Sequence, residues 1–145
     1  MGHRGAGPNS ERGQALVEAA LVIPVLLLLV FGVVMAGRIS HAKVAVQAAA
    51  REASRELATA ASEQDGLTAA LQTARSVADD YGLEQERLTV DMESNGFQRG
   101  GTTTARVTYR VGLGDLPLLG RLGVTVSSSH SERIDLYRSR EAVLR

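Results

Sequence analysis

The feature that most constrains this chain is an uncharged run near its N-terminus. The run extends from Ala19 to Gly37, is bounded by Glu18 and Arg38, and is rich in leucine and valine. As an α-helix with a rise of about 1.5 Å per residue it would span roughly 28 Å, which matches the hydrocarbon core of a bilayer. The sequence therefore predicts a transmembrane helix, which we place at residues 14–38.

Two other interpretations of this run remain open on the sequence. A buried core helix of a soluble protein would need a polar stripe for solvent, but the aliphatic residues from Val25 to Leu29 and their neighbours cover every face. A cleaved secretory signal would fit the upstream residues Arg4 and Arg12, although the apolar run is longer than an ordinary signal core. We therefore favour the membrane anchor over both.

Three residues within the run predict local features of the helix. Pro24 lacks a backbone N–H, so the helix is expected to kink there, which membrane helices tolerate. Gly32 and Ala36 are four residues apart and form a small-xxx-small pair, a pattern that lets a second helix approach closely. We predict a kink at Pro24 and a helix-packing surface at Gly32 and Ala36.

Glu18 lies at the edge of the run, where a carboxylate costs about 2–3 kcal/mol if it must enter the hydrocarbon. The segment from Arg12 to Glu18 resembles the processing site of type IV prepilins, in which a membrane aspartyl peptidase cuts after the glycine. The resemblance implies a cut between Gly13 and Gln14. The new ammonium on Gln14 would lie one helical turn from Glu18 and pair with it, within one subunit or between neighbours. Alternatively, Glu18 marks the membrane edge and reaches into water.

The wider stretch over residues 12–58 contains Gly13, Glu18, Pro24, the aliphatic run, Gly37–Arg38 and the segment VQAAARE at 46–52. With these residues the stretch resembles the TadE-like family of tight-adherence pilus proteins. The C-terminal sequence VTVSSSHSERIDL is similar to that family in character, whereas Ala19 stands where this branch of prepilins often has an aromatic residue. The resemblance implies a membrane-anchored minor pilin or pseudopilin-like component of a tight-adherence (Flp-type) pilus or related secretion system, acting in assembly or adhesion.

The same resemblance implies the partners and the location of the protein. The expected partners are the membrane, a prepilin peptidase if the chain is processed, and other pilins or pilus assembly proteins. Contacts through the N-terminal helices would make hetero- or homo-oligomers. We expect a single-pass membrane protein with an extracytoplasmic C-terminal domain, or incorporation in an extracellular pilus. Basic residues flank both sides of the run, so charge does not decide the orientation, and this expectation rests on the resemblance.

Beyond Arg38 the pattern predicts a helical region over residues 39–82. An alanine-rich segment continues the first helix to about residue 61. A second, amphipathic helix is predicted at 66–81, with Asp65 as its N-terminal cap and Gly82 at its end.

After Gly82 the apolar period changes to two, which predicts an antiparallel sheet over residues 83–138. Two alternating strands, with apolar positions from Leu88 to Met92 and from Ala105 to Leu113, are separated by glycine-rich turn sequence. A loop from Gly112 to Gly120 precedes a third strand near Leu122, which we expect to resume at Ile134 and Leu136.

Together these patterns predict an α+β, pilin-like fold. It consists of a long N-terminal transmembrane and rod helix, a second amphipathic helix, and a small antiparallel sheet of about three strands. Residues 1–13 form a polar leader in this prediction, and residues 139–145 form a tail.

Composition excludes several other functions. The net charge is zero and aromatic residues make up 3% of the chain, so nucleic acid is not an expected partner. The chain has no cysteine, and no metal or cofactor motif is present. In the run Ser129-His130-Ser131-Glu132, strand neighbours would point to opposite faces, so no catalytic site is expected. Two function classes remain: a pilin-like component, and a generic single-pass anchored protein presenting a small binding module.

Overall fold

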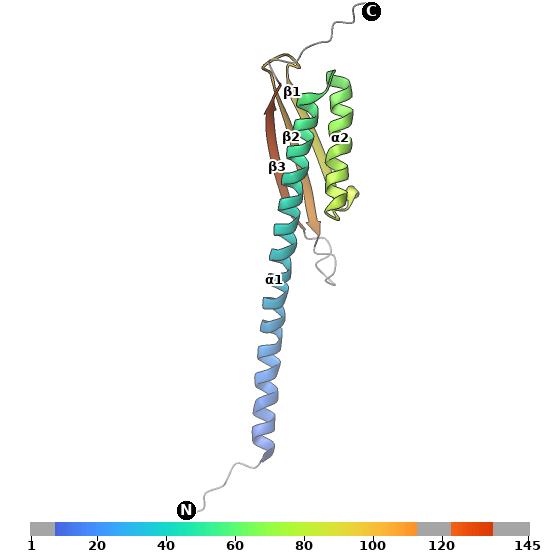
Figure 1. Cartoon of the computed structure of the whole chain (residues 1–145). Helices are drawn as coiled ribbons and strands as arrows, with labels where there is room; N and C mark the ends of the chain where they lie inside the picture. Colours follow the sequence, from blue (N-terminus) through green and yellow to red (C-terminus); the bar gives the residue numbers. More distant parts are fainter. Residues whose placement is uncertain (1–7, 113–122, 135–145) are drawn as a thin grey trace, which may run out of the picture. The chain divides into compact units, whose positions relative to one another are not determined.

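The computed structural model describes residues 8–112 and 123–134, with side chains from residue 13 onward, and it has an α+β fold (Figure 1). The elements, in order, are α1 (Pro8–Thr59), α2 (Glu63–Asp80), the short 3-10 helix η1 (Gln85–Arg87), β1 (Leu88–Asn95), β2 (Thr102–Gly112) and β3 (Gly123–Arg133). The predicted fold class is thus confirmed. The chain divides into two compact units, residues 1–37 and residues 38–145, and α1 contributes to both.

The second unit is built on an antiparallel sheet in the order β1-β2-β3. β2 is central, with Val107 opposite Val90 of β1 and opposite Ser128 of β3. Side chains along β2 alternate between buried and less buried positions, as the period of two requires. The buried set on this strand is Thr103, Ala105, Val107, Tyr109 and Val111.

The helices of the second unit bury alanine faces. Along α1 the fully buried side chains include Ala45, Ala49 and Ala53, and along α2 they are Ala70, Ala74 and Ala78. Because residues four apart lie on one side of a helix, each set forms a narrow, smooth stripe. The Thr103 hydroxyl of β2 donates to the Ser54 carbonyl of α1 at 3.5 Å, and this contact joins the helix to the sheet. Small side chains therefore let these elements pack closely around the larger buried residues Leu57, Val46 and Val107.

The start of α2 differs from the sequence prediction. α2 begins at Glu63, because Ser62 caps it, whereas we expected Asp65 to be the cap of a helix starting at residue 66. The Ser62 hydroxyl accepts from the Asp65 backbone N–H at 3.2 Å and donates to the Asp65 carboxylate at 2.7 Å. Asp65 occupies the third helical position, so its backbone N–H and its carboxylate can both bond to the Ser62 hydroxyl. The prediction of Asp65 as the cap was wrong because it overlooked this reciprocal pairing.

The third strand also differs in detail from its prediction. β3 runs without a break from Gly123 to Arg133, and Ile134 follows it as a 2% exposed side chain. The Ile134 N–H donates to the Gly101 carbonyl at 2.9 Å, and the Gly100 N–H donates to the Ile134 carbonyl at 3.1 Å. These two hydrogen bonds join the turn between β1 and β2 to the residue that follows β3. Several predicted features lie outside the described residues: the leader up to residue 7, Leu113 and the loop after it, Leu122, Leu136 and the tail at 139–145.

Gly66 is a position where the packing of α1 against α2 can be tested. A Cβ added there would lie 2.6 Å from Ala60 Cβ and 2.9 Å from Leu57 Cδ1. We predict that Gly66→Ala lowers stability, because overpacking costs about 1–3 kcal/mol and helix propensity returns at most about 1 kcal/mol. Thermal unfolding of the full chain in detergent, followed by circular dichroism, measures this. Gly37→Ala is the matched control, since its added Cβ meets nothing within 4 Å, and an equal or higher melting temperature for Gly66→Ala would contradict the prediction.

Candidate functional site

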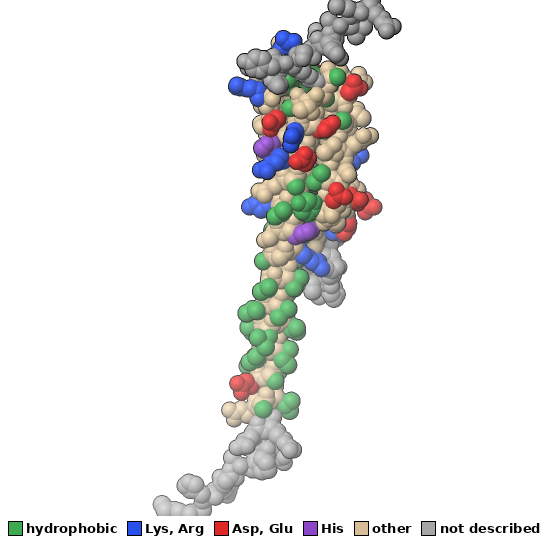
Figure 2. All heavy atoms as spheres, viewed as in Figure 1, with side chains coloured by type: hydrophobic (Ala, Val, Ile, Leu, Met, Phe, Trp, Pro, Cys, Tyr) green, Lys and Arg blue, Asp and Glu red, His purple; other side chains and the backbone are tan. Residues whose placement is uncertain are grey.

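The first unit presents an apolar surface that the protein itself does not cover (Figure 2). Large aliphatic side chains such as Leu21, Leu28 and Val33 are 69%, 70% and 66% exposed. Among the described residues, α1 is the one helix long and apolar enough to cross a membrane. Its apolar window is almost wholly exposed, so the interpretation as a buried core helix is wrong. The surface is consistent with a single-pass membrane protein.

The residues of the predicted processing site lie in consecutive turns of α1. Gly13, Gln14 and Glu18 are all exposed, and Gln14 and Glu18 are four residues apart on one helix, which places them on the same face. The Gly13–Gln14 peptide bond lies inside the helix, five residues after its start at Pro8. A peptidase would therefore have to open the first turns before cutting there. Processing at Gly13 and ion pairing by Glu18 stay predictions.

The predicted packing residues lie further along the same segment. Pro24 lies within α1, and Gly32 and Ala36 are exposed one turn apart on it. A Cβ added to Gly32 meets nothing within 4 Å, so this position is open to the approach of another helix. The kink at Pro24 and the packing role of Gly32 and Ala36 stay predictions.

A second candidate surface is a groove in the second unit, between α1 and β3. It has a volume of about 530 Å³ and is lined by Val44, Gln47, Ala48, Arg51 and Glu52 of α1 and by Ser128, Ser129 and His130 of β3. In the described residues β3 pairs on one side only, with β2. Its other edge therefore presents backbone groups that are not used by the sheet. The groove is open rather than an enclosed cavity, and its lining mixes charged, polar and small apolar side chains.

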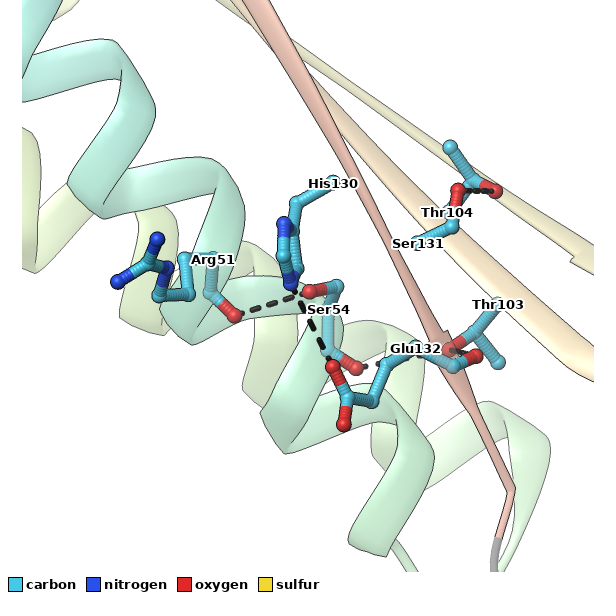
Figure 3. Close-up of polar contacts among 7 residues, drawn as sticks. All are labelled: Arg51, Ser54, Thr103, Thr104, His130, Ser131 and Glu132. Atoms are coloured by element: carbon cyan, nitrogen blue, oxygen red, sulfur yellow. Dashed lines mark hydrogen bonds and ion pairs between the residues drawn. The ribbon is translucent and has the colours of Figure 1, made fainter.

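The polar side chains beside this groove do not converge on a nucleophile (Figure 3). His130 Nε2 lies 3.5 Å from Glu132 Oε2, and both side chains are partly exposed. The Ser131 hydroxyl is instead 2.9 Å from the Thr104 hydroxyl, on the opposite face of the sheet from His130. Among the described residues, no group of three or more His, Asp or Glu side chains is arranged to hold a metal. These contacts join strands and neighbouring side chains.

A smaller cleft at the start of the second unit was missed by the sequence analysis. It has a volume of about 180 Å³, and Arg38, His41 and Arg87 contribute to its lining. His41 Nε2 donates to the Tyr81 carbonyl at 2.9 Å, which links α1 to the end of α2. Arg38 and His41 belong to α1, whereas Arg87 belongs to η1, which is distant in the sequence, so no local motif marked the cleft.

The fold and the apolar surface thus define an α+β protein, and the part of the chain that the structure describes contains one candidate membrane-spanning helix. In a comparison with protein families, the model of the TadE-like protein family matches residues 13–55, which lie within this helix. The match confirms the predicted TadE-like relationship, and it includes both the apolar run and the buried alanine face of α1 as far as residue 55. No curated protein and no solved structure matches the chain. The TadE-like relationship suggests involvement in tight-adherence pilus assembly in the membrane.

A charge placed in the apolar surface tests whether lipid covers it. We predict that Leu27→Arg reduces the fraction of protein resistant to extraction from membranes, because arginine at the centre of a spanning helix costs about 2.5–3.5 kcal/mol. Alkaline extraction of membranes followed by immunoblotting measures that fraction. Val44→Arg is the matched control, since Val44 is 53% exposed and Leu27 is 64% exposed, but Val44 follows the apolar run. Equal extraction of the two variants would contradict a role for the run as the membrane anchor.

Proposed function

We propose that this protein is a membrane-anchored minor pilin or pseudopilin-like component of a tight-adherence pilus or related secretion system, acting in pilus assembly or adhesion. The observation that carries the proposal is the TadE-like match over residues 13–55, a segment that contains an exposed apolar helix. The folded second unit supports a minor component, because the main subunit of such pili is typically little more than a helix. In this proposal the protein has no enzymatic activity and uses no cofactor.

The proposed mechanism is lateral packing of apolar helices. In the membrane the exposed aliphatic side chains of α1 contact lipid, and in an assembly they contact the same segment of neighbouring subunits. Gly32 and Ala36 allow close approach of helices, and Glu18 then pairs with the amine of Gln14 on a processed neighbour. An ion pair in this low-dielectric setting favours a defined register, because each charge is costly without its partner.

The orientation in this proposal places the leader in the cytoplasm and residues from Arg38 onward on the other side of the membrane. Prepilin peptidase would then reach the Gly13–Gln14 bond from the membrane, and the second unit would be free to meet extracytoplasmic partners. A reporter fused after Arg145 tests the orientation. Activity of a reporter that works only in the cytoplasm would contradict it.

A second candidate function is a generic anchored protein that presents a binding module. The groove between α1 and β3 is the specific observation in its favour, because an open groove of about 530 Å³ beside an unpaired strand edge suits a peptide or another protein. The two candidates differ in what they require of the N-terminal segment. Only the pilin-like component requires processing at Gly13 and a role for Glu18 in assembly.

The processing step gives a direct prediction for the pilin-like function. We expect the protein recovered from its native cell to start at Gln14, as measured by intact mass and N-terminal sequencing. We also expect Glu18→Gln to be processed normally but to form fewer cross-linked oligomers, because it keeps the side-chain size and removes the charge that pairs with the Gln14 amine. Glu63→Gln is the matched control, since Glu63 is an exposed acid in the first turn of α2.

Two outcomes would contradict this proposal. A chain that starts at Met1 or Gly2 would exclude prepilin processing and leave Glu18 as a membrane-edge residue. Cross-linking of Glu18→Gln at the level of Glu63→Gln would exclude a role for the Glu18 charge in assembly.

A further inference from the structure

β3 forms one edge of the sheet (Figure 1), and the groove between α1 and β3 lies beside it. Three consecutive strand residues, Ser128, Ser129 and His130, line the groove, although neighbours in a strand point their side chains to opposite faces. One groove can reach all three only at the strand edge, where the backbone itself is accessible. Ser128 is the central residue of β3, so the groove meets the middle of this edge.

Hydrogen bonds near the end of β3 indicate which backbone groups point to the open edge. The Ile134 N–H donates to the Gly101 carbonyl, and the Glu132 carbonyl accepts from the Thr103 hydroxyl at 3.3 Å. Even-numbered residues of β3 thus direct their backbone groups toward β2, and in an antiparallel ladder the residues between them direct theirs to the other side. These residues include Thr125, Ser127, Ser129 and Ser131. Each offers one N–H and one C=O to an added strand.

The edge of β3 lacks the features that usually block an open edge. Proteins commonly protect such edges with charged side chains, prolines or bulges. β1, at the other edge of the sheet, carries Asp91 and Glu93 along its length. β3 has no Asp, Glu, Lys, Arg or Pro from Gly123 to Ser131, and its register with β2 is continuous. The backbone of β3 is therefore open to pairing with another extended chain.

The helix side of the groove favours apolar side chains on that chain. Val44 and Ala48 are one turn apart on α1 and both line the groove, and the Val44 side chain is 53% exposed. On β3, Val124 is 41% exposed and points to the same face of the sheet as the buried Val126. The groove volume of about 530 Å³ lies within the range of about 300–1,000 Å³ that is usual for binding sites. A strand with apolar side chains at alternate positions would cover these valines.

We propose that β3 binds an extended segment of another protein as an added antiparallel strand, whose alternate apolar side chains face Val44 and Ala48. β3 of a second copy is a poorer match, because its helix-facing side carries the polar residues Ser128, His130 and Glu132. The inference deepens the second candidate function, a binding module, and rests on it. It does not require N-terminal processing, so an unprocessed chain leaves it standing, and failure to bind a peptide leaves the pilin-like function standing.

The test measures the binding of fluorescein-labelled model peptides to the full chain in detergent by fluorescence anisotropy, with protein-free micelles as the blank. The parent peptide has valines alternating with threonines between terminal lysines. When its valines face α1 in an antiparallel pairing, the threonine N–H groups face β3. We expect saturable binding of the parent peptide and of an analogue N-methylated on the valines. An analogue N-methylated on the threonines should not bind, although its composition is closely matched.

Ser129→Pro tests the same edge from the protein side. Proline lacks the backbone N–H, and an edge strand tolerates it where that N–H points away from the ladder. We expect Ser129→Pro to bind the parent peptide about tenfold more weakly, because one hydrogen bond is lost. Ser129→Ala is the matched control, since it loses the hydroxyl and keeps the N–H, and it should bind as the wild type does. Circular dichroism verifies folding, and the comparison of peptides on the wild type stands even if Ser129→Pro fails to fold.

Three results would overturn the proposal. The first is equal binding of the three peptides by the wild type, and the second is equal binding of the parent peptide by Ser129→Pro and Ser129→Ala. Either would exclude recognition through the backbone of β3. The third is a wild-type dimer in size-exclusion chromatography that becomes monomeric in Ser129→Pro and is not displaced by the parent peptide. The edge would then pair with a second copy, and its assignment to another protein would be wrong.

Discussion

The apolar surface of α1 between residues 19 and 37 is the constraint on which the rest of the account depends. Its large aliphatic side chains are mostly half to two-thirds exposed, and the protein has no second layer of structure over them in the described residues. Covering so many side chains is favourable by on the order of ten kcal/mol or more, given about 1.5–3 kcal/mol for each fully buried aliphatic side chain. That is comparable to the whole stability of a typical domain, so a lipid or protein environment for this surface is required.

In the second unit, the same helix α1 packs against the rest of the fold through a different kind of side chain. There α1 carries alanines rather than leucines on its buried side, and α2 does the same. Small side chains give little hydrophobic stabilisation each, but they allow backbones to approach closely, and contacts such as that of Thr103 with Ser54 then become possible. One helix therefore has two kinds of surface: a bulky one that needs an external partner and a smooth one that packs within the domain.

The sequence predicted the features that depend on local periodicity. The uncharged run, the alanine-rich continuation and the alternation around Val107 each follow from one element, and the structure contains the corresponding helices and strands. The sequence was less informative where two residues act together. Ser62 caps α2 through paired contacts with Asp65, whereas the sequence analysis predicted Asp65 as the cap, and β3 runs unbroken to Arg133, whereas the strand was expected to resume at Ile134. Serine in β3 is tolerated because alternate positions face solvent.

The candidate sites were predictable to different degrees. Gly13, Gln14 and Glu18 were predicted as a processing site because the residue types and their spacing along one short segment are enough to recognise the pattern. The cleft containing Arg38, His41 and Arg87 was not found, because the sheet and the α2–β1 connection bring its members together. The groove between α1 and β3 was missed for the same reason. Sites made by tertiary packing leave no pattern in a single sequence.

The most direct measurement of the central claim is chemical labelling of single cysteines, since the natural chain has none. Leu28 is 70% exposed and Lys43 is also exposed, so the protein alone would leave a cysteine at either position reactive. If lipid covers the apolar surface, a membrane-impermeant maleimide added to intact spheroplasts will label Lys43→Cys, and it will label Leu28→Cys only after unfolding in SDS. Equal labelling of both variants in intact membranes would contradict the account.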